Sequence, residues 1–252
     1  MSDKCNIRID WATHEAAKYA VETWHYSKAL PVPPLVKIGA WENGKYIGCV
    51  IFSRGANNNL LKPFNLLKTE GCELTRVALS RHKTEVSKVL KHAMLFLKRN
   101  SPGMRLIVSF ADPSEGHHGG IYQAGNWIYT GVQPDSIEYI GPDGKKWHGR
   151  MVKKQGWTTC HGKRRKTFTP DQCIAVKKLG KHRYLMPLDK EMKKQVSLLS
   201  KPYPKKSSVV SSKIEHLPNQ EEEGGVVPTT TLHFNNQKIV DSTHEVAKNA
   251  SE

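Results

Sequence analysis

Asp112 is the first side chain whose place in the sequence suggests chemistry. It directly follows the stretch RLIVSFA (105–111), which is too apolar on both faces to form a solvated strand. Ligands of α/β sheets bind beyond the carboxyl ends of such buried strands. The glycine-containing segment PSEGHHGG (113–120) comes next and allows the backbone to approach a substrate closely. Asp112 is therefore a candidate to accept a proton from a substrate amine or to orient that amine. The alternative is an ordinary helix cap.

His25 and Tyr26 form a second candidate group. They lie between a helical pattern and the rigid stretch KALPVPP (28–34), a position suited to a lid or to a surface on which a base stacks. His25 could equally cap the C-terminus of that helix. Together with Asp112, or with the pair at 117–118, it also raises the question of a metal such as iron or zinc. No two of these residues stand at a recognised ligand spacing, so the metal ligands stay unassigned.

The N-terminal pattern predicts the elements that would carry these groups. Ala17, Ala20, Val21 and Trp24 recur at helical spacing behind a Thr13 N-cap, so a helix is expected to run up to His25. The Asn-Gly pair at 43–44 predicts a tight hairpin turn between strands at 36–41 and 46–52.

The middle of the chain predicts a strand-helix-strand crossover. An apolar stripe from Val86 to Leu97 favours a helix between strands at 73–79 and 105–111, which are then parallel. The fold class expected is α/β, with a mixed central sheet around this crossover. Further elements are expected as a short helix at 121–124 and strands at 127–131, 136–140, 147–151 and 182–188.

The net charge of +16 is concentrated in one block of the chain. Residues 145–206 hold 19 Lys and Arg against 3 Asp and Glu, whereas the rest of the chain is balanced. Such a block attracts a polyanion, and neutralising phosphates releases counterions, which favours DNA. A membrane surface is less favoured because the block has no amphipathic helix, and a merely solvated basic surface remains an alternative. The residues expected to contact DNA are Arg150, Lys153, Lys154, Lys163, Arg164, Arg165 and Lys166.

Residues 73–131 resemble the GNAT acyltransferase superfamily. ELTRVALSRHKTEVSKVLKHAMLFL, RLIVSFAD and GGIYQAGNWIYTG match its strand, helix, strand and closing elements. The resemblance implies an acetyl-CoA or related acyl-CoA cofactor, whose pyrophosphate binds at the N-terminus of the helix that starts near Thr84. The usual glycine-rich loop is replaced by SRHKTEVS, and the alternative is an ordinary capped helix on a sheet. The expected cofactor-binding residues are Arg76, Leu79, Ser80, Arg81, Lys83 and Ser87.

A narrower resemblance is to the Mom proteins, with which some bacteriophages modify adenines in their DNA. WHYSKALPVPP, ELTRVAL, VSFADPSEGHHGGIYQAGNWIYTG and KHRYLMPL carry it. It implies conversion of the exocyclic amine of adenine to a carbamoylmethylated amine, which protects phage DNA from restriction enzymes in the cytoplasm of the infected host. It favours iron over zinc, because this transfer is not ordinary acyl transfer. The GNAT resemblance implies that Tyr122 protonates a departing thiolate. Arg76 is expected to pair with a phosphate or with Asp112, because strand neighbours in a sheet can face the same cleft. The catalytic residues that the Mom resemblance indicates are His25, Tyr26, Asp112 and Tyr122.

Three segments are expected: a GNAT-like catalytic core at 1–144, a basic extension that packs on the core and contacts DNA at 145–203, and a disordered tail at 204–252. The five cysteines have no CxxC spacing, and no apolar run approaches the roughly 20 residues of a membrane helix. We therefore expect an intracellular protein with no disulfide framework and no membrane partner. Two other functions stay open, a conventional N-acetyltransferase for a protein or small amine and a noncatalytic nucleic-acid-binding protein. Oligomeric state is not predicted.

Overall fold

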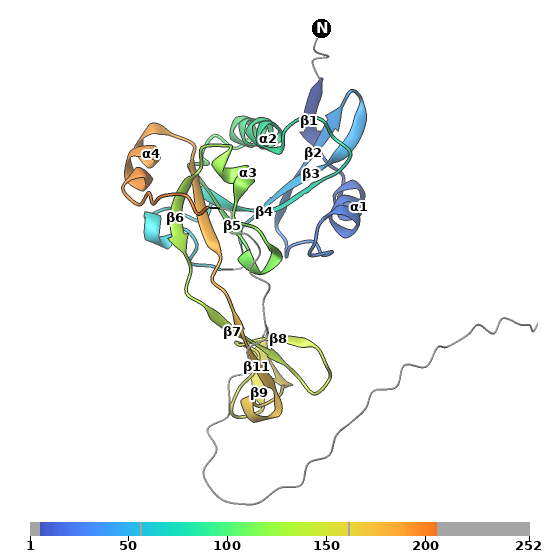
Figure 1. Ribbon diagram of the computed structural model, residues 1–252, viewed down its shortest axis with the longest axis vertical. Coiled ribbons are helices and arrows are strands. Elements are labelled where there is room, and N and C mark those ends of the chain that lie inside the picture. The colour runs from blue at the N-terminus through green and yellow to red at the C-terminus, as the bar shows by residue number, and fades with distance from the viewer. Residues whose placement is uncertain (1–5, 56, 161, 206–252) are drawn as a thin grey trace, which may run out of the picture. The chain divides into compact units, whose positions relative to one another are not determined.

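A seven-stranded mixed sheet is the centre of the computed structural model, which describes residues 6–55, 57–160 and 162–205 (Figure 1). The strand order is β1-β2-β3-β4-β5-β12-β6, and only β4 and β5 pair in parallel. In chain order the elements are β1 (Ile7–Trp11), α1 (His14–Trp24), β2 (Leu35–Glu42), β3 (Lys45–Ser53), a 3-10 turn (Lys62–Phe64), β4 (Gly71–Leu79), α2 (Val86–Asn100), β5 (Leu106–Ala111), a 3-10 turn (Pro113–Glu115), α3 (Gly120–Gln123), β6 (Ile128–Val132), β7 (Ser136–Ile140), β8 (Lys146–His148), β9 (Trp157–Cys160), β10 (Lys163–Lys166), a 3-10 turn (Pro170–Gln172), β11 (Ile174–Lys178), β12 (His182–Pro187) and α4 (Lys190–Ser197).

The local signals of the sequence are confirmed in the N-terminal half. The Thr13 hydroxyl accepts the N–H of Ala16 and caps α1, while His25 follows its last turn. Asn43 and Gly44 adopt positive φ angles of 50° and 79°, as the hairpin between β2 and β3 requires. The mixed α/β class with its β4-α2-β5 crossover is confirmed as well.

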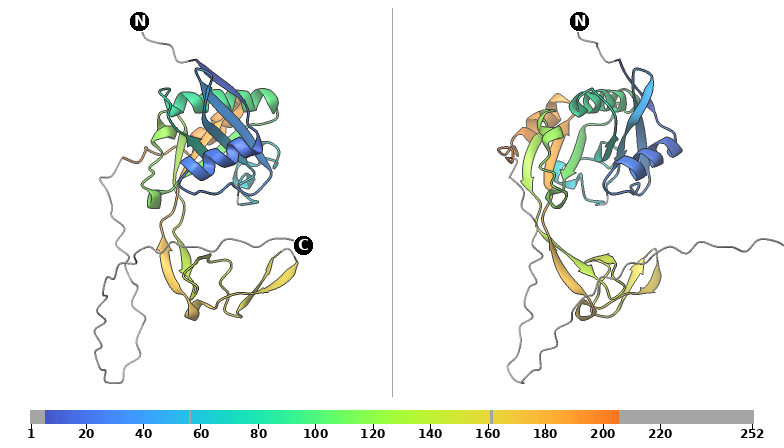
Figure 2. Two further views of the ribbon diagram at one scale, coloured as in Figure 1. Left: turned by 90° about the vertical axis from the view of Figure 1, so that its right-hand side faces the viewer. Right: turned by 45° about the vertical axis from the view of Figure 1, so that its right-hand side comes forward.

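Helices cover both faces of the sheet (Figure 2). Neighbouring residues of β3 point to opposite faces, so Val50 packs in the cluster that includes α2, while Ile51 packs in the cluster that includes α1. In β5 the same alternation places Ile107 in the α2 cluster and Val108 with α4. The apolar side chains of α2, which form one stripe in the sequence, are therefore buried because they cover one face of the mixed sheet.

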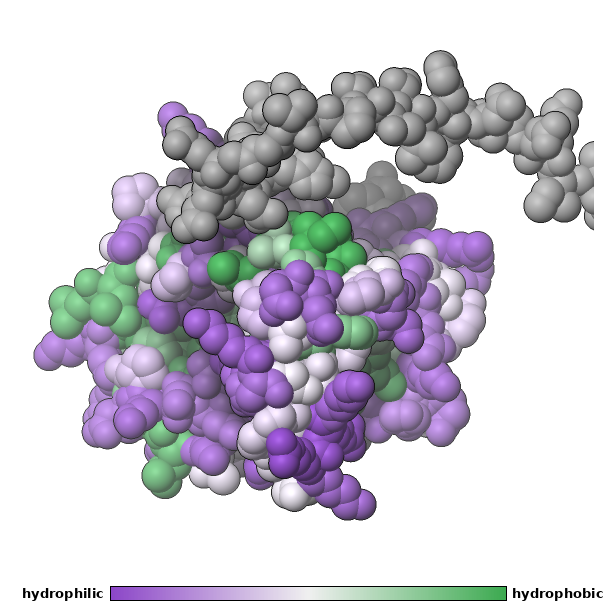
Figure 3. Space-filling view, turned by 90° about the horizontal axis from the view of Figure 1, so that it is seen from below, coloured by the Kyte–Doolittle hydropathy of each residue, from purple (hydrophilic) through white to green (hydrophobic). Residues whose placement is uncertain are grey.

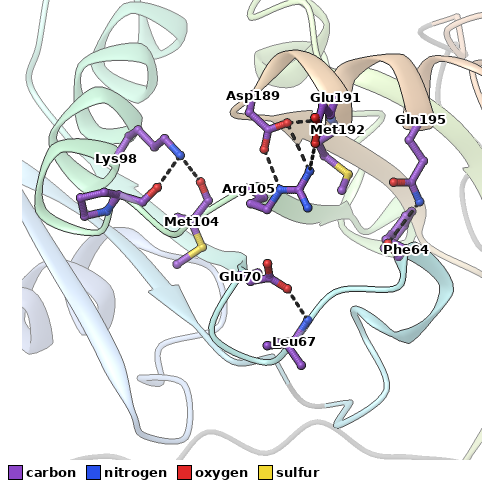
Figure 4. A network of polar contacts seen from close by, with 11 residues as sticks. Phe64, Leu67, Glu70, Lys98, Met104, Arg105, Asp189, Glu191, Met192 and Gln195 are labelled. Atoms are coloured by element: carbon purple, nitrogen blue, oxygen red, sulfur yellow. Dashed lines mark hydrogen bonds and ion pairs between the residues drawn. The ribbon is translucent and has the colours of Figure 1, made fainter.

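The sequence did not predict β1 or α4. α4 has only Met192 and Val196 as buried residues in a strongly charged stretch, so its helical pattern is weak. It is held by tertiary contacts instead (Figure 4): the Arg105 guanidinium pairs with Asp189 at 2.9 Å and with Glu191 at 3.2 Å. Asp189 also caps the helix by accepting the N–H of Met192.

The basic block is divided between the main sheet and smaller sheets. The strand predicted at 182–188 is confirmed as β12, which lies between β5 and β6 in the main sheet. By contrast, β7, β8 and β11 form a three-stranded sheet, and β9 and β10 form a two-stranded sheet of their own. The strand predicted at 147–151 ends at His148, because the N–H of Arg150 bonds to the imidazole of His148 and closes a turn. Of the disordered tail predicted at 204–252, residues 206–252 lie outside the described residues.

Candidate active site at the split between β4 and β5

The parallel strands β4 and β5 lose their pairing part-way along. Their ladder runs from the Gly71–Leu106 pair to the Leu74–Ser109 pair and stops, although β4 continues to Leu79. Thr75 is an extra residue in the ladder with β3 at this point, because Leu74 pairs with Phe52 and Arg76 already pairs with Ile51. A bulge bends its strand and increases the local twist, so it explains why β4 leaves β5 at this place.

A buried hydrogen-bonded chain lies at the split. The hydroxyl oxygen of Ser109 is 2.8 Å from the carbonyl oxygen of Leu74 and 2.8 Å from the phenol oxygen of Tyr122. Since a carbonyl can only accept, Ser109 can donate to Leu74 while it accepts the phenol proton. Burial raises the pKa of Tyr122 to about 12, so the phenol keeps its proton at neutral pH. The sequence indicated Tyr122 but gave no signal for Ser109.

His25 is buried at the end of α1, and its surroundings determine which nitrogen carries the proton. The backbone N–H of Ser27 donates to Nδ1 over 3.1 Å, and the Ser27 hydroxyl lies 2.9 Å from the same nitrogen. An amide N–H can only donate, whereas a hydroxyl can donate or accept, so both contacts fit a neutral ring that accepts at Nδ1 and has its proton on Nε2. Burial, followed by the positive charge of Arg76, lowers the pKa of His25 to about 4. His25 is therefore neutral at physiological pH and is a donor at Nε2.

Tyr26 brings two segments of the chain together. Its ring centroid is 4.3 Å from that of His25 and 5.4 Å from that of His117, which follows β5. Tyr26 is 49% exposed, so part of this residue is accessible to a ligand. Arg76 ties the same loop to β4 by donating to the carbonyl oxygens of Ala29, at 3.2 Å, and Thr75, at 2.7 Å.

Asp112 does not form the ion pair with Arg76 that was one of the two expectations for Arg76. Its carboxylate lies 3.0 Å from the Lys181 ammonium and accepts the N–H of Ser114, so it caps the turn after β5. Burial alone would raise the pKa of Asp112, but the hydrogen bond and charge of Lys181 outweigh it and lower the pKa. The Asp112 carbonyl accepts the N–H of His117, which connects the residue to the aromatic group through the backbone.

The loop in front of α2 already binds a carboxylate of this chain. Glu42, at the end of β2, accepts the N–H groups of Lys83 at 2.9 Å and Thr84 at 2.8 Å, and the Thr84 hydroxyl at 2.7 Å. The Thr84 hydroxyl, followed by the Lys83 N–H, lowers the pKa of Glu42 to about 2. The sequence did not indicate Glu42, because its partners lie about forty residues away.

The other expected cofactor-binding residues surround this loop. Leu79 ends β4, the N–H of Ser80 bonds to the Ile47 carbonyl, and Arg81 is exposed with a positive φ of 52°. Ser87 lies in the first turn of α2, where the N-cap residue Glu85 makes no side-chain capping bond. The backbone N–H groups near the N-terminus of α2 therefore fall into two sets. Those of Lys83 and Thr84 are bound by Glu42, whereas the first turn of the helix receives no capping bond from the Glu85 side chain.

Residues 6–205 match the model of the Mom protein family. The chain belongs to the Mom protein family. It is 22% identical over 210 residues to the methylcarbamoylase mom of Escherichia phage Mu, an alignment that covers 79% of this chain and 84% of that protein.

Solved acetyltransferases resemble this Mom family protein at low similarity. A Bacillus subtilis acetyltransferase in complex with CoA is 14% identical with a TM-score of 0.41, covering 74% of this chain and 100% of its own. An IAA acetyltransferase from Bacillus cereus is 15% identical with a TM-score of 0.41, covering 73% and 100%. These TM-scores are low, so the fold class of this Mom family protein rests on its strand order and crossover.

The metal that the sequence left open, with iron favoured, has no ligand cluster in the described part of this Mom family protein. No three His, Cys, Asp or Glu side chains there are grouped so that they could hold an ion. Asp112 is occupied by Lys181, and the ring of His117 packs on Tyr26. The expectation of an iron site is therefore not supported. Across the same residues, no helix combines the length and apolar composition needed to cross a bilayer.

The residues expected to contact DNA lie in or next to the smaller sheets of this Mom family protein. Arg150 and Lys154 are exposed, and Lys153 is half-buried between β8 and β9. The other four form the whole of β10 and are all exposed. Hydrophilic residues also predominate on the face shown in Figure 3, where hydrophobic residues form separate groups.

Proposed function

We propose that this protein is a transferase that modifies adenine in DNA, converting the exocyclic amine to a carbamoylmethylated amine. The observation that carries the proposal is the split between β4 and β5 of this Mom family chain. The protonated phenol of Tyr122 bonds to Ser109 at the split, and Arg76, just beyond it on β4, bonds to the loop that follows His25. The product would protect phage DNA from restriction enzymes in the cytoplasm of the infected host. The proposed type of transfer is supported by the relative from phage Mu, which is described as a methylcarbamoylase.

The chain's own residues support defined roles in this transfer. Tyr122 holds a proton on its phenol oxygen, and we assign it the role of proton donor to the leaving group, for which the phenol hydrogen must turn away from Ser109. His25 presents an N–H at Nε2 and can stabilise a developing negative charge on an acyl oxygen. Asp112 has a lowered pKa and is a weak base, so we assign it the orientation of the adenine amine and not the removal of its proton.

An acyl-CoA or related thioester fits the loop in front of α2 in part. When bound, such a thioester supplies the activated acyl group. Two loop amides are taken by Glu42, so the phosphates would depend on other donors. The exposed Arg81 and Lys83 side chains, the Ser87 hydroxyl and the uncapped first turn of α2 provide them. We propose no iron in this site.

Adenine in a duplex is paired, so its amine becomes accessible only when the base is flipped out. The exposed ring of Tyr26, backed by His25 and His117, offers a surface on which a flipped base can stack. The exposed cations of 150–166 would hold the phosphates, which gives affinity without sequence choice. Substrate capture and donor binding then involve separate parts of the chain.

Mass spectrometry of nucleosides from plasmid DNA, isolated after expression in a bacterial host, tests the proposal. We expect a deoxyadenosine adduct of carbamoylmethyl mass with the wild type and none with Asp112→Ala, whose DNA affinity should stay unchanged. Asp135→Ala is the matched control, since Asp135 also pairs with a lysine and accepts a backbone N–H. Unmodified DNA from folded wild-type protein would favour an N-acetyltransferase of other amines or a noncatalytic DNA-binding protein. An adduct in the Asp112→Ala sample would refute the role of Asp112.

A further inference from the structure

The strands β9 and β10 form a free two-stranded ribbon. They pair with each other, with Trp157 opposite Lys166 and Cys160 opposite Lys163, and among the described residues no third strand joins either edge. The base of the ribbon is fixed, because the buried Thr167 donates its N–H to Gly156 and its hydroxyl to the carbonyl of Met151. The ribbon is therefore a separate two-stranded element with an anchored base.

Positive charge lies on both faces of this ribbon. Successive residues of a strand point to opposite faces, so Lys163 and Arg165 share one face while Arg164 and Lys166 share the other. All four side chains are exposed. Within the described residues no carboxylate forms an ion pair with any of them.

Trp157 holds one of these cations in place. The guanidinium of Arg164 lies 4.0 Å from the centroid of the Trp157 ring, on the face that it shares with Lys166. A stacked guanidinium loses less conformational entropy when it meets a phosphate, because its side chain is already restrained. The second face has no such restraint, so the two faces differ in rigidity but not in charge.

We propose that the β9–β10 ribbon enters the major groove of duplex DNA, with each face directed to one phosphate wall. A flat anionic surface would meet one face and leave the cations of the other unused, whereas a groove has phosphates on both sides. A strand pair with its side chains is about 10 Å thick. The major groove is about 12 Å wide and the minor groove about 6 Å, so only the major groove admits the ribbon.

This inference rests on the proposed function for its choice of DNA, but it goes further by naming the docking element, the groove and a duplex substrate. The ribbon would hold the duplex while a base leaves the stack elsewhere. Contacts to both walls also fix the ribbon's position across the groove without reading any base.

Salt-dependent binding of a labelled duplex to the full chain tests the ribbon. We expect Lys163→Ala with Arg165→Ala, and separately Arg164→Ala with Lys166→Ala, each to weaken binding about ten-fold or more and to lower the slope of log affinity against log salt by about 1.8. The matched control is Lys193→Ala with Lys194→Ala, which removes the same charge from exposed positions of α4 and should change neither quantity. Equal thermal unfolding of all variants shows that the fold is kept.

The groove is tested with two further probes. A duplex with glucosylated 5-hydroxymethylcytosine, which fills the major groove, should bind weakly, and netropsin, which fills the minor groove, should not compete. Loss of affinity from only one face, displacement by netropsin, or ribbon variants that bind like the α4 control would overturn the inference. Adduct formation is measured separately: if the wild type forms no adduct but the ribbon variants still lose duplex affinity, the proposed function fails and the ribbon's role stands.

Discussion

The backbone N–H of Ser27 donates to Nδ1 of His25, and this one contact determines what the histidine can do. An imidazole that accepts at Nδ1 and is neutral must carry its proton at Nε2. His25 is therefore a hydrogen-bond donor at Nε2, and it cannot take a proton at that nitrogen as a general base.

His25→Gln should retain measurable modification, whereas His25→Ala should lose it by about 100-fold or more, the range seen when an oxyanion donor is removed. The glutamine amide can place an N–H near the position of Nε2, while alanine has no donor. Adduct yield per unit time for the two variants is the measurement. Equal loss in both would show that the ring itself, and not its N–H, is required.

Stability should also depend on pH through His25. Its pKa is about 4 when folded and near 6.5 when exposed, so the folded state favours the neutral ring. The corresponding stabilisation is fully present above pH 6.5 and is lost as the pH falls toward 4, by about 3 kcal/mol at most. Urea unfolding between pH 7 and 4 should show a smaller decline for His25→Gln than for the wild type. Parallel curves would contradict the burial of this ring.

Tyr122→Phe should lower kcat by about 100-fold or more with little change in KM, because it removes only a proton donor. Tyr129→Phe is the control: its phenol bonds to His182 in the same aromatic cluster but lies away from Ser109. Single-turnover modification rates compare the two. If Tyr129→Phe were the slower enzyme, the assignment of the proton donor would be wrong.

Glu42→Ala should lower the free energy of unfolding by about 2 kcal/mol, because two loop N–H groups and a hydroxyl lose their acceptor. Acyl-CoA binding should weaken as well, since the loop in front of α2 is no longer held. Glu22→Ala removes an exposed carboxylate that pairs with Lys18 and should change stability by less than about 0.5 kcal/mol. Denaturant unfolding and titration with acetyl-CoA measure both effects. Tighter acetyl-CoA binding by Glu42→Ala would show that Glu42 competes with the cofactor.

Local physics explains what the sequence determined by itself. The Thr13 cap, the Asn43-Gly44 turn and the apolar stripe of α2 act within a few residues, so each could be recognised without a partner. The β4-α2-β5 crossover followed, because a helix between two apolar strands allows few other arrangements. Asp112, Tyr122 and His25 were indicated in the same way, by their place at the ends of such elements and by the Mom resemblance.

Only the tertiary structure decided how those residues meet. The bulge at Thr75 separates β4 from β5, and the partner of Asp112 proves to be Lys181, about seventy residues later in the chain. Glu42 reaches the loop before α2 by a similar long-range contact. Such contacts depend on strand register and on which segment fills the next place in the sheet, as β12 does between β5 and β6. Strand register and strand order produce no periodic or short-range pattern in a single sequence, because the partners are brought together by the packing of the whole sheet.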